Sequence, residues 1–533
     1  MSEDNGSSGA TRSLWKSTGP EVAAESGLEG DLDTDVCIVG GGIAGLTVAY
    51  QLARTGQRIV LLDARQPCSG ETERTTAHLA SALDDGFTHL ESLHGVEGAR
   101  LAAESHAAAI DYIEAVVREL KLDCEFRRVD GYLCLGPKDD ASSLERELHA
   151  ALRAGLTVEM VDAAPVGTFQ GPSLKFAAQA QLNPLRYLAG LAAAVTRLGG
   201  RIVSGARVIE VSGGDDGCKV VTESGHTVRA RAAVVATNTP INDRYVIHTK
   251  QAAYRTYAMA LELRDDSDAP DALLWDTEEP YHYVRRSLGA DGVQVVVVGG
   301  EDHKTGQDAR PEHHWEQLEA WARAHFSGLG RVVSSWSGQV LEPSDGLAFI
   351  GPNPSDADNV YIVTGDSGHG LTHGTIAGML LPELIAGREH PWATLYDPSR
   401  KSLRALPAFA KENFNVAAQY LKWVAPADVA DERDIPRGEG AVVRKGLRRI
   451  AVYRDEHGAC QRVSAACPHL GAVVAWNAAE KTWDCPAHGS RFGTDGQVVT
   501  GPSSRGLAPE DREGDPDADV ETVQVAPAAA RAR

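Results

Sequence analysis

The chain has 533 residues and a formal net charge of −22, from 74 acidic and 52 basic side chains. This acidity argues against nucleic acid or an anionic membrane as a partner. The chain shows no signal-peptide pattern and no apolar run of 18 residues, and only two of its eight cysteines lie in a metal-binding pattern, so we expect a cytoplasmic protein of three or four units without disulfides.

The first 30 residues are predicted to be a mobile segment. Residues 1–12 and 20–30 are rich in Ser, Gly and Glu, a composition that disfavours a packed core. Between them, Ser13-Leu14-Trp15 is apolar enough to dock on the domain that follows, through Trp15.

A dinucleotide-binding motif follows at residues 35–63. An apolar strand runs into Gly40, Gly42 and Gly45, spaced as G-x-G-x-x-G, and a helical stretch leads to a second apolar strand that ends on Asp63. The glycines allow a pyrophosphate to approach the backbone at a helix start, while the carboxylate can bind a ribose hydroxyl. This motif alone does not separate FAD from NAD. We find no second fingerprint for NAD(P)H, so we expect electrons to enter from an organic substrate.

Periodicity predicts most of the following elements. Helices are expected over residues 90–120, from about 182 to 199, 372–385 and 407–420, the last one amphipathic and preceded by a polar connector at about 390–404. Strands are expected at 201–211, 219–221, 232–236, 254–263, 281–286, 294–299 and 360–364. The strands at 254–263, 281–286 and 294–299 should form an antiparallel sheet over the cofactor.

The most informative motif lies near the end of the chain. Cys467 and His469 form C-x-H, fifteen residues follow from Leu470 to Asp484, and Cys485 and His488 form C-x-x-H. Two thiolates and two imidazoles delivered from two tight loops are the ligands of a Rieske [2Fe–2S] cluster. A structural zinc site is the alternative, although zinc sites usually pair Cys with Cys and His with His.

These motifs carry two resemblances. Residues 30–400 resemble the family of D-amino-acid oxidase, glycine oxidase and sarcosine oxidase, and the last hundred residues resemble Rieske proteins. The resemblance implies an α/β FAD-binding domain of the Rossmann-like, glutathione-reductase type, an α+β antiparallel-sheet substrate domain and an all-β Rieske domain. The expected boundaries are 31–100, 180–245 and 335–390 for the FAD-binding domain, 101–179 and 246–334 for the substrate domain, 391–422 for the connector and helix, and 423–525 for the Rieske domain.

The resemblance also implies which residues bind the two cofactors, FAD and the [2Fe–2S] cluster. The metal ligands are Cys467, His469, Cys485 and His488. The expected FAD-binding residues are Gly40, Gly42, Gly45, Asp63, Ala64, Arg65, Thr75, Thr76, His78, Val208, Thr237, Gly365, Asp366, Gly368, His369, Gly370, Leu371 and Thr372.

The sequence departs from the respiratory form of the Rieske family. Ala472 and Ala487 stand where respiratory members carry an extra disulfide, and Phe492 replaces a tyrosine that donates a hydrogen bond to a ligand sulfur, while Ser490 is kept. Fewer donors to sulfur stabilise the reduced cluster less. We therefore expect a potential in the lower half of the Rieske range.

The substrate site is expected on the antiparallel sheet. Alternation would point Tyr281, Tyr283 and Arg285 to one face. By resemblance we select Arg285 to hold a substrate carboxylate and Tyr283 and His369 to line the flavin. Other candidates on this sheet are Tyr254, Arg255, Tyr257, Trp275, His282 and His303.

Two alternatives stay open near the flavin. Asp366, His369 and His373 could form a second iron site of two histidines and one carboxylate. His78 lies where some amine dehydrogenases attach flavin covalently.

The expected function is oxidation of an amine or amino acid at its C–N bond by FAD, with electrons passing through the cluster to an external carrier. One alternative reverses the flow, so that a flavin monooxygenase or reductase receives electrons through the cluster. The other is a redox carrier without enzymatic activity.

Overall fold

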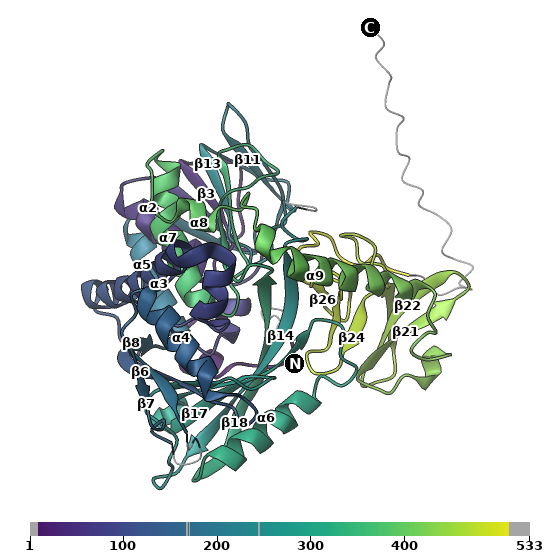
Figure 1. Ribbon diagram of the computed structural model, residues 1–533. Helices are drawn as coiled ribbons and strands as arrows, with labels where there is room; N and C mark the ends of the chain where they lie inside the picture. Colours follow the sequence, from purple (N-terminus) through teal and green to yellow (C-terminus); the bar gives the residue numbers. More distant parts are fainter. Residues whose placement is uncertain (1–8, 167–168, 170, 243–245, 511–533) are drawn as a thin grey trace, which may run out of the picture.

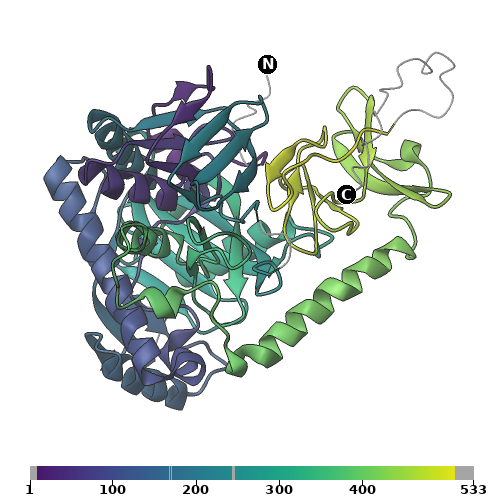
Figure 2. The same ribbon diagram turned by 90° about the horizontal axis from the view of Figure 1, so that it is seen from above.

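The computed structural model describes residues 9–166, 169, 171–242 and 246–510. They form a large lobe and a small lobe that begins near residue 425 (Figure 1). Helix α9 (Leu406–Gln419) runs along the outside of the molecule from one lobe to the other (Figure 2). No helix in the described ranges combines the length and apolar character needed to cross a membrane.

A seven-stranded sheet forms one half of the large lobe. All neighbouring strands are parallel except β19 and β20, which are antiparallel. The strand order is β1 (Glu25–Ser26), β9 (Arg201–Ser204), β4 (Ile59–Leu62), β3 (Val36–Val39), β13 (Ala232–Val235), β20 (Val360–Thr364) and β19 (Phe349–Pro352).

Both faces of this sheet are covered, which explains why its central strands β4, β3, β13 and β20 are buried along their whole length. Val36 and Ile38 of β3 point into the core formed with the helices, whereas Cys37 and Val39 point into a second core. The helices on the first face are α2 (Ile43–Arg54), α5 (Pro184–Arg197) and α7 (Gly370–Ile385). The second face is covered by a sheet of β10 (Val208–Ser212), β11 (Cys218–Thr222), β12 (Thr227–Ala230) and β2 (Leu32–Asp33).

The other half of the large lobe is a nine-stranded sheet. The expected antiparallel pairing of the three strands over the cofactor is confirmed, with β17 between β14 and β16. The order is β18 (Leu329–Pro343), β14 (Gln251–Leu263), β17 (Gln294–Lys304), β16 (His282–Leu288), β15 (Leu273–Asp276), β6 (Arg127–Cys134), β8 (Ser173–Gln181) and β5 (His78–Leu79), with β7 (Val158–Val161) paired to β8.

The predicted helices are present near their expected bounds. The longest, α3 (Gly86–Leu120), contains a break at Gly95, where φ is +73°. The remaining helices are α1 (Leu14–Thr18), α4 (Ala141–Arg153), α6 (His313–His325) and α8 (Ala393–Tyr396), with short 3₁₀ turns η1 (Glu71–Arg74), η2 (Ala290–Gly292), η3 (Leu403–Ala405), η4 (Tyr420–Trp423) and η5 (Glu432–Asp434).

The small lobe has a hydrophobic core of its own. Trp483 and Phe492 are fully buried there, together with the two candidate cysteine ligands. Its two sheets consist of β21 (Glu439–Lys445), β22 (Arg448–Arg454) and β23 (Cys460–Ser464), and of β24 (Ala475–Asn477), β25 (Thr482–Asp484), β26 (Arg491–Phe492) and β27 (Val498–Thr500).

Three local expectations are wrong. Residues 20–30 are not a mobile segment, because β1 pairs with β9 and Val22 is buried; residues 1–8 lie outside the described ranges. The strand expected over 201–211 is two strands in different sheets, since the chain turns at Gly205 with φ of +65°. The connector at 390–404 contains α8.

The domain boundaries stay a prediction. Strand β18 runs across the boundary placed between residues 334 and 335.

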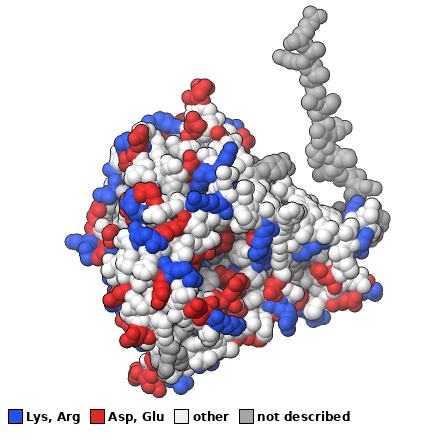
Figure 3. Space-filling view, in the orientation of Figure 1, with Lys and Arg blue, Asp and Glu red and all other residues white. Residues whose placement is uncertain are grey.

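The surface combines both charges. Acidic and basic side chains are interspersed on the face shown in Figure 3, and no patch of one sign covers it. Helix α9 packs one side on the lobes, as its amphipathic pattern predicts. Phe409, Asn413 and Val416 are half-buried, and Val416 packs against the core of the small lobe, whereas Leu406 and Phe414 remain exposed.

Candidate functional site

A cavity in the large lobe is lined by both of its large sheets. One end lies beyond the carboxyl ends of the parallel strands β3, β4 and β13, where nucleotides bind in open α/β sheets. The other end is lined by Thr256 of β14, Trp275 of β15 and Tyr283 of β16.

The turn between β3 and α2 requires its glycines. Gly40 has φ of +105°, and a Cβ on it would lie 2.4 Å from the Ala236 carbonyl oxygen. A Cβ on Gly45 would lie 1.9 Å from the Gly40 carbonyl oxygen. The Asp63 carboxylate accepts the backbone N–H groups of Gly41 at 2.7 Å and Arg65 at 2.9 Å. The structure therefore forms the expected dinucleotide turn, with Asp63 fixed beside it.

The structure brings most of the predicted residues to this cavity. Those that line it are Gly40, Gly42, Asp63, Ala64, Arg65, Thr75, Thr76, His78, Val208, Thr237, Tyr283, Asp366, Gly368, His369, Gly370 and Leu371. Four predicted residues do not line it: Gly45, Gly365, Arg285 and Thr372. Gly45 lies beneath the turn, and the Thr372 hydroxyl is 2.9 Å from Nδ1 of His106 instead.

The far end of the cavity carries a carboxylate that sequence reasoning missed. Asp84 lines it, and Nε2 of His369 lies 3.4 Å from Oδ1 of Asp84. The Tyr281 hydroxyl donates to Oδ2 of Asp84 at 3.4 Å. Although burial opposes ionisation, His369 and this hydroxyl hold the pKa of Asp84 below its ordinary value. Asp84 is therefore a carboxylate at neutral pH.

Arg285 does not line the cavity, although it was expected to hold a substrate carboxylate there. Its guanidinium donates to the carbonyl oxygens of Ala77 at 2.7 Å and Leu182 at 3.0 Å. Its Cζ lies 5.2 Å from the centre of the Trp15 ring, and both side chains are buried. Alternation along β16 correctly predicted the face of the sheet on which Arg285 lies, but not that its side chain is buried. Arg285 fastens the N-terminal segment to the large lobe, and Trp15 docks there as expected.

His78 is engaged through both ring nitrogens. Nδ1 lies 3.1 Å from the Thr76 hydroxyl and Nε2 lies 3.2 Å from the Val284 carbonyl oxygen. Burial lowers the pKa of His78 to about 3, so the ring is neutral at physiological pH. These contacts position His78 beside the cavity.

The second iron site considered above does not form. Within the described ranges, Asp366, His369 and His373 are not among the groups whose ligand atoms lie within 4.8 Å of one another. His373 turns its Nδ1 to the Asp366 carbonyl oxygen at 2.9 Å and its Nε2 to His106 at 3.2 Å.

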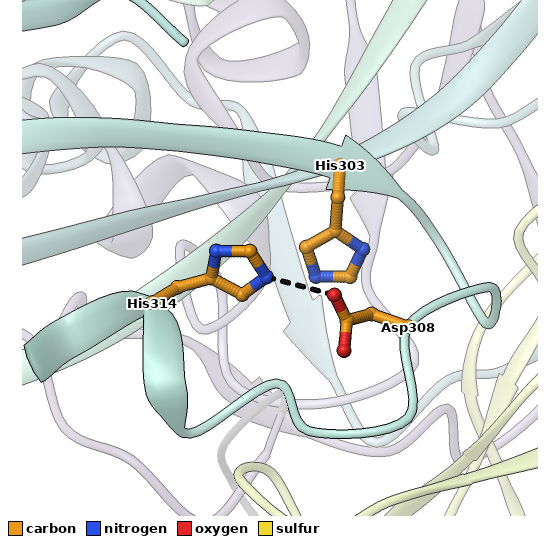
Figure 4. A group of neighbouring side chains, drawn as sticks. All are labelled: His303, Asp308 and His314. Atoms are coloured by element: carbon orange, nitrogen blue, oxygen red, sulfur yellow. Dashed lines mark hydrogen bonds and ion pairs between the residues drawn. The ribbon is translucent and has the colours of Figure 1, made fainter. Parts of the chain in front are cut away.

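His303 points away from the cavity, although it was a substrate-site candidate. Figure 4 shows it on β17, beside Asp308 of the following loop and His314 of α6. The His303 and His314 rings stack with centres 4.7 Å apart, and Nε2 of His314 lies 3.0 Å from Oδ2 of Asp308. The Tyr257 hydroxyl lies 2.9 Å from Nε2 of His303. These contacts join β17 to α6 on the side of the sheet away from the cavity.

The four candidate metal ligands meet at the tips of two loops in the small lobe. Gly471 and Gly489, with φ of +78° and +76°, close the loops by donating to the carbonyl oxygens of Cys467 at 2.8 Å and Cys485 at 3.0 Å. The rings of His469 and His488 lie 5.0 Å apart. Both cysteines are buried, and both histidines are nearly so.

The spacing of these ligands distinguishes a cluster from a single zinc ion. The two thiols interact directly, which lowers the pKa of Cys467. However, no three of the four residues, all of which lie in the described ranges, place ligand atoms within 4.8 Å of one another. A zinc ion with ligands at 2.0–2.3 Å requires closer convergence. Nδ1 of His488 is buried and makes no hydrogen bond, as expected of an atom that binds iron.

The cluster loops contact the wall of the cavity. Gln339 of β18 lines the cavity, and its Nε2 donates to the carbonyl oxygen of Gly489, the residue after His488, at 3.1 Å. His248 of the large lobe lies with its ring centre 5.0 Å from that of His469 and 6.1 Å from that of His488. The imidazole side of the cluster site therefore faces the large lobe.

The small lobe also closes the nucleotide end of the cavity. The lining there includes residues 498–501, 503 and 504, and Arg207 donates to the Val498 carbonyl oxygen at 3.0 Å. None of these contacts was predicted, because they join parts of the chain hundreds of residues apart.

A buried ion pair fastens the two lobes. Oε1 of Glu480, in the turn between β24 and β25, lies 2.9 Å from Nη1 of Arg74 and 3.4 Å from Nη2 of Arg255. These side chains have no exposed surface. The Thr11 hydroxyl donates to the same carboxylate at 2.6 Å, so the N-terminal segment contributes to the contact.

Comparison with known proteins identifies both units. Residues 35–384 match the family described as FAD dependent oxidoreductase, and residues 425–510 match the Rieske [2Fe-2S] domain. The chain belongs to the FAD-dependent oxidoreductase family. It is 32% identical to the Rieske 2Fe-2S iron-sulfur protein YhfW of Bacillus subtilis (strain 168) over 499 residues, covering 93% of this chain and 97% of that protein.

Two further likenesses concern the large lobe. Gamma-glutamylputrescine oxidoreductase of Escherichia coli (strain K12) is 23% identical over 394 residues, covering 71% of this chain and 89% of that enzyme. The crystal structure of glycine oxidase from Geobacillus kaustophilus shares the fold, with a TM-score of 0.57 at 16% identity, over 69% of this chain and 99% of that one.

The expectations for fold class and cofactors are thereby confirmed. The FAD-dependent oxidoreductase unit binds FAD, and the Rieske domain binds a [2Fe–2S] cluster. The cavity fits FAD, because its glycine turn leaves room for a pyrophosphate and its Asp63 can accept a ribose hydroxyl. The chain is an FAD-dependent oxidoreductase with a Rieske domain.

Proposed function

We propose that this enzyme oxidises the C–N bond of an amine or amino acid and passes the electrons through the Rieske cluster to an external one-electron carrier. The observation that carries this proposal is the hydrogen bond from Gln339, in the cavity wall, to Gly489, beside the cluster ligand His488. The name of the related gamma-glutamylputrescine oxidoreductase supports a substrate that contains nitrogen.

The cofactors divide the chemistry, since flavin accepts a hydride and the cluster carries single electrons. In the proposed reaction the substrate C–H bond breaks, its electron pair leaves as hydride, the nitrogen loses one proton and a C=N bond forms. Two equivalents of the external carrier then remove the two electrons one at a time. The chain contributes by holding the substrate: Tyr281, Tyr283 and Trp275 line the far end of the cavity.

The docked small lobe supports electron exchange between the two cofactor sites. His248 covers the imidazoles of His469 and His488, so the edge of the cluster site that they form faces the flavin-binding lobe. A one-electron relay is useful where a cofactor that accepts hydride must be reoxidised by carriers that take single electrons.

Cys485→Ser tests the proposal, because it removes a cluster ligand without touching the cavity. We expect substrate to bleach the flavin of this variant anaerobically at close to the wild-type rate, while steady-state turnover with a one-electron acceptor falls at least about tenfold. Cys460→Ser is the matched control, because it makes the same change in β23 of the same lobe, at a cysteine that is not a cluster ligand and does not line the cavity.

Other outcomes would contradict the proposal. If substrate alone never bleaches wild type, and an external carrier reduces FAD only when the cluster is intact, electrons enter through the cluster. If Cys485→Ser turns over at the wild-type rate and forms one peroxide per substrate, the enzyme is a simple oxidase.

A further inference from the structure

The charges at the two ends of the cavity differ. The arginines that line it are Arg65, Arg74 and Arg207. Arg65 lies beside Asp63, Arg207 bonds to Val498, and Arg74 pairs with buried Glu480. All three therefore lie toward the nucleotide end or at the lobe interface. Among the described lining residues, no Arg or Lys stands at the far end, where a substrate would meet the flavin.

The far end carries the carboxylate of Asp84 instead. Its side chain is 37% accessible although it lies in a recess, because it borders the cavity. A Cβ on Gly368 would lie 2.8 Å from Oδ2 of Asp84, so this carboxylate packs directly on the glycine-rich turn before α7. That turn is the element expected to meet the flavin ring, so Asp84 stands next to the reacting end of the site.

Aromatic rings complete the surroundings of Asp84. The rings of Tyr281 and Tyr283 have centres 5.5 Å apart and are tilted by 37°, and Trp275 lines the same end. Aromatic faces attract ammonium groups, and a carboxylate beside them adds a charge-assisted hydrogen bond. A free carboxylate on the substrate would meet Asp84 as a like charge, with Arg285 unavailable because it is buried under Trp15.

We infer that this site binds the ammonium group of an amine that carries no α-carboxylate, with Asp84 as its counter-ion and Tyr281 and Tyr283 as its aromatic walls. This inference rests on the proposed function for the chemistry and adds the class of substrate. Asp84 is a binding residue in this account. Before hydride leaves the carbon, the ammonium gives up one proton to solvent, which reaches this end of the cavity at the partly exposed Asp84.

Binding can be tested without turnover by two ions of similar shape. Tert-butylammonium has no hydrogen on the carbon that bears nitrogen, so it cannot be oxidised by hydride loss, and pivalate carries the same tert-butyl group on a carboxylate. Each ion is titrated into oxidised holoenzyme while the flavin absorption bands are followed. We expect tert-butylammonium to bind at least about tenfold more tightly than pivalate.

The variant Asp84→Asn keeps the shape of the side chain and removes its charge. It should weaken tert-butylammonium roughly ten- to hundredfold and leave pivalate unchanged or tighter. Asp85→Asn is the matched control, because it removes the same charge one residue along the chain from a side chain that does not line the cavity. Its affinities should stay within about threefold of wild type. Tighter binding of pivalate, binding of neither ion, or an unchanged affinity in Asp84→Asn would overturn the inference.

A substrate panel separates this inference from the proposed function. Isobutylamine is compared with valine, and benzylamine with phenylglycine, which differ only by the α-carboxylate. We expect anaerobic bleaching of the flavin by the amine of a pair. If only the amino acid of a pair bleaches the flavin, the inference is wrong and C–N oxidation is upheld. If an ammonium ion binds through Asp84 but no nitrogen compound bleaches the flavin, the inference is upheld and the proposed function is wrong.

Discussion

The buried contact between the lobes predicts a large effect of one substitution, Glu480→Gln. The change leaves Arg74 and Arg255 buried next to a neutral amide, and Nε and Nη1 of Arg255 already make no hydrogen bond. Removing one partner of a buried ion pair costs about 3–5 kcal/mol. We expect Glu480→Gln to weaken the docking of the small lobe on the large lobe by this amount of free energy.

The pKa of Glu480 predicts how this contribution depends on pH. Burial opposes ionisation, yet Arg74, Arg255 and Arg491 lower the pKa of Glu480 from 4.5 to about 2. The stabilisation is therefore fully present above about pH 4.5 and is lost as pH falls from there toward 2. Glu480→Gln should lack this part of the acid sensitivity.

The measurement must resolve the lobes, because a chain of several units does not unfold in one step. Denaturant unfolding is followed by cluster absorption for the small lobe and by flavin fluorescence for the large one. Glu456→Gln, which removes the same charge from an exposed turn of the small lobe, should change stability by less than about 0.5 kcal/mol. The reasoning is refuted if the two variants unfold alike at neutral pH.

Two further predictions concern the large lobe. A Cβ on Gly42 would lie 2.8 Å from the Thr72 hydroxyl, in the space for the pyrophosphate. Gly42→Val should therefore lose FAD but keep two acid-labile sulfides per chain, because the small lobe has its own core. If the purified variant has lost both cofactors, the two units are not separable. Arg285→Lys should lower the free energy of unfolding by about 1–3 kcal/mol, because one ammonium cannot replace a guanidinium that donates to several carbonyl oxygens. The KM for substrate should not change. A raised KM at unaltered stability would instead place Arg285 in the substrate site.

The accuracy of the sequence-based predictions followed the range of the interactions. Gly40, Gly42 and Asp63 could be placed because a nucleotide turn is built within one strand–helix–strand unit, and the cluster ligands because each pair lies within four residues. Arg285 was misplaced because alternation gives a face of a strand and not what covers it. Asp84 and Glu480 were missed because their partners, His369 and Arg74, are separated from them by hundreds of residues.

The small lobe could fold on its own core, yet it completes a cavity that belongs to the large lobe. Residues 498–501 close the nucleotide end, and Gln339 ties the cavity wall to Gly489. A ligand that contacts both lobes stabilises their docked arrangement, because binding to one state shifts the equilibrium toward it. Occupation of the cavity by FAD and docking of the Rieske domain are therefore linked. This linkage, together with buried Glu480, fixes the cluster site beside the flavin site, so the electron transfer that we propose requires no movement of the small lobe.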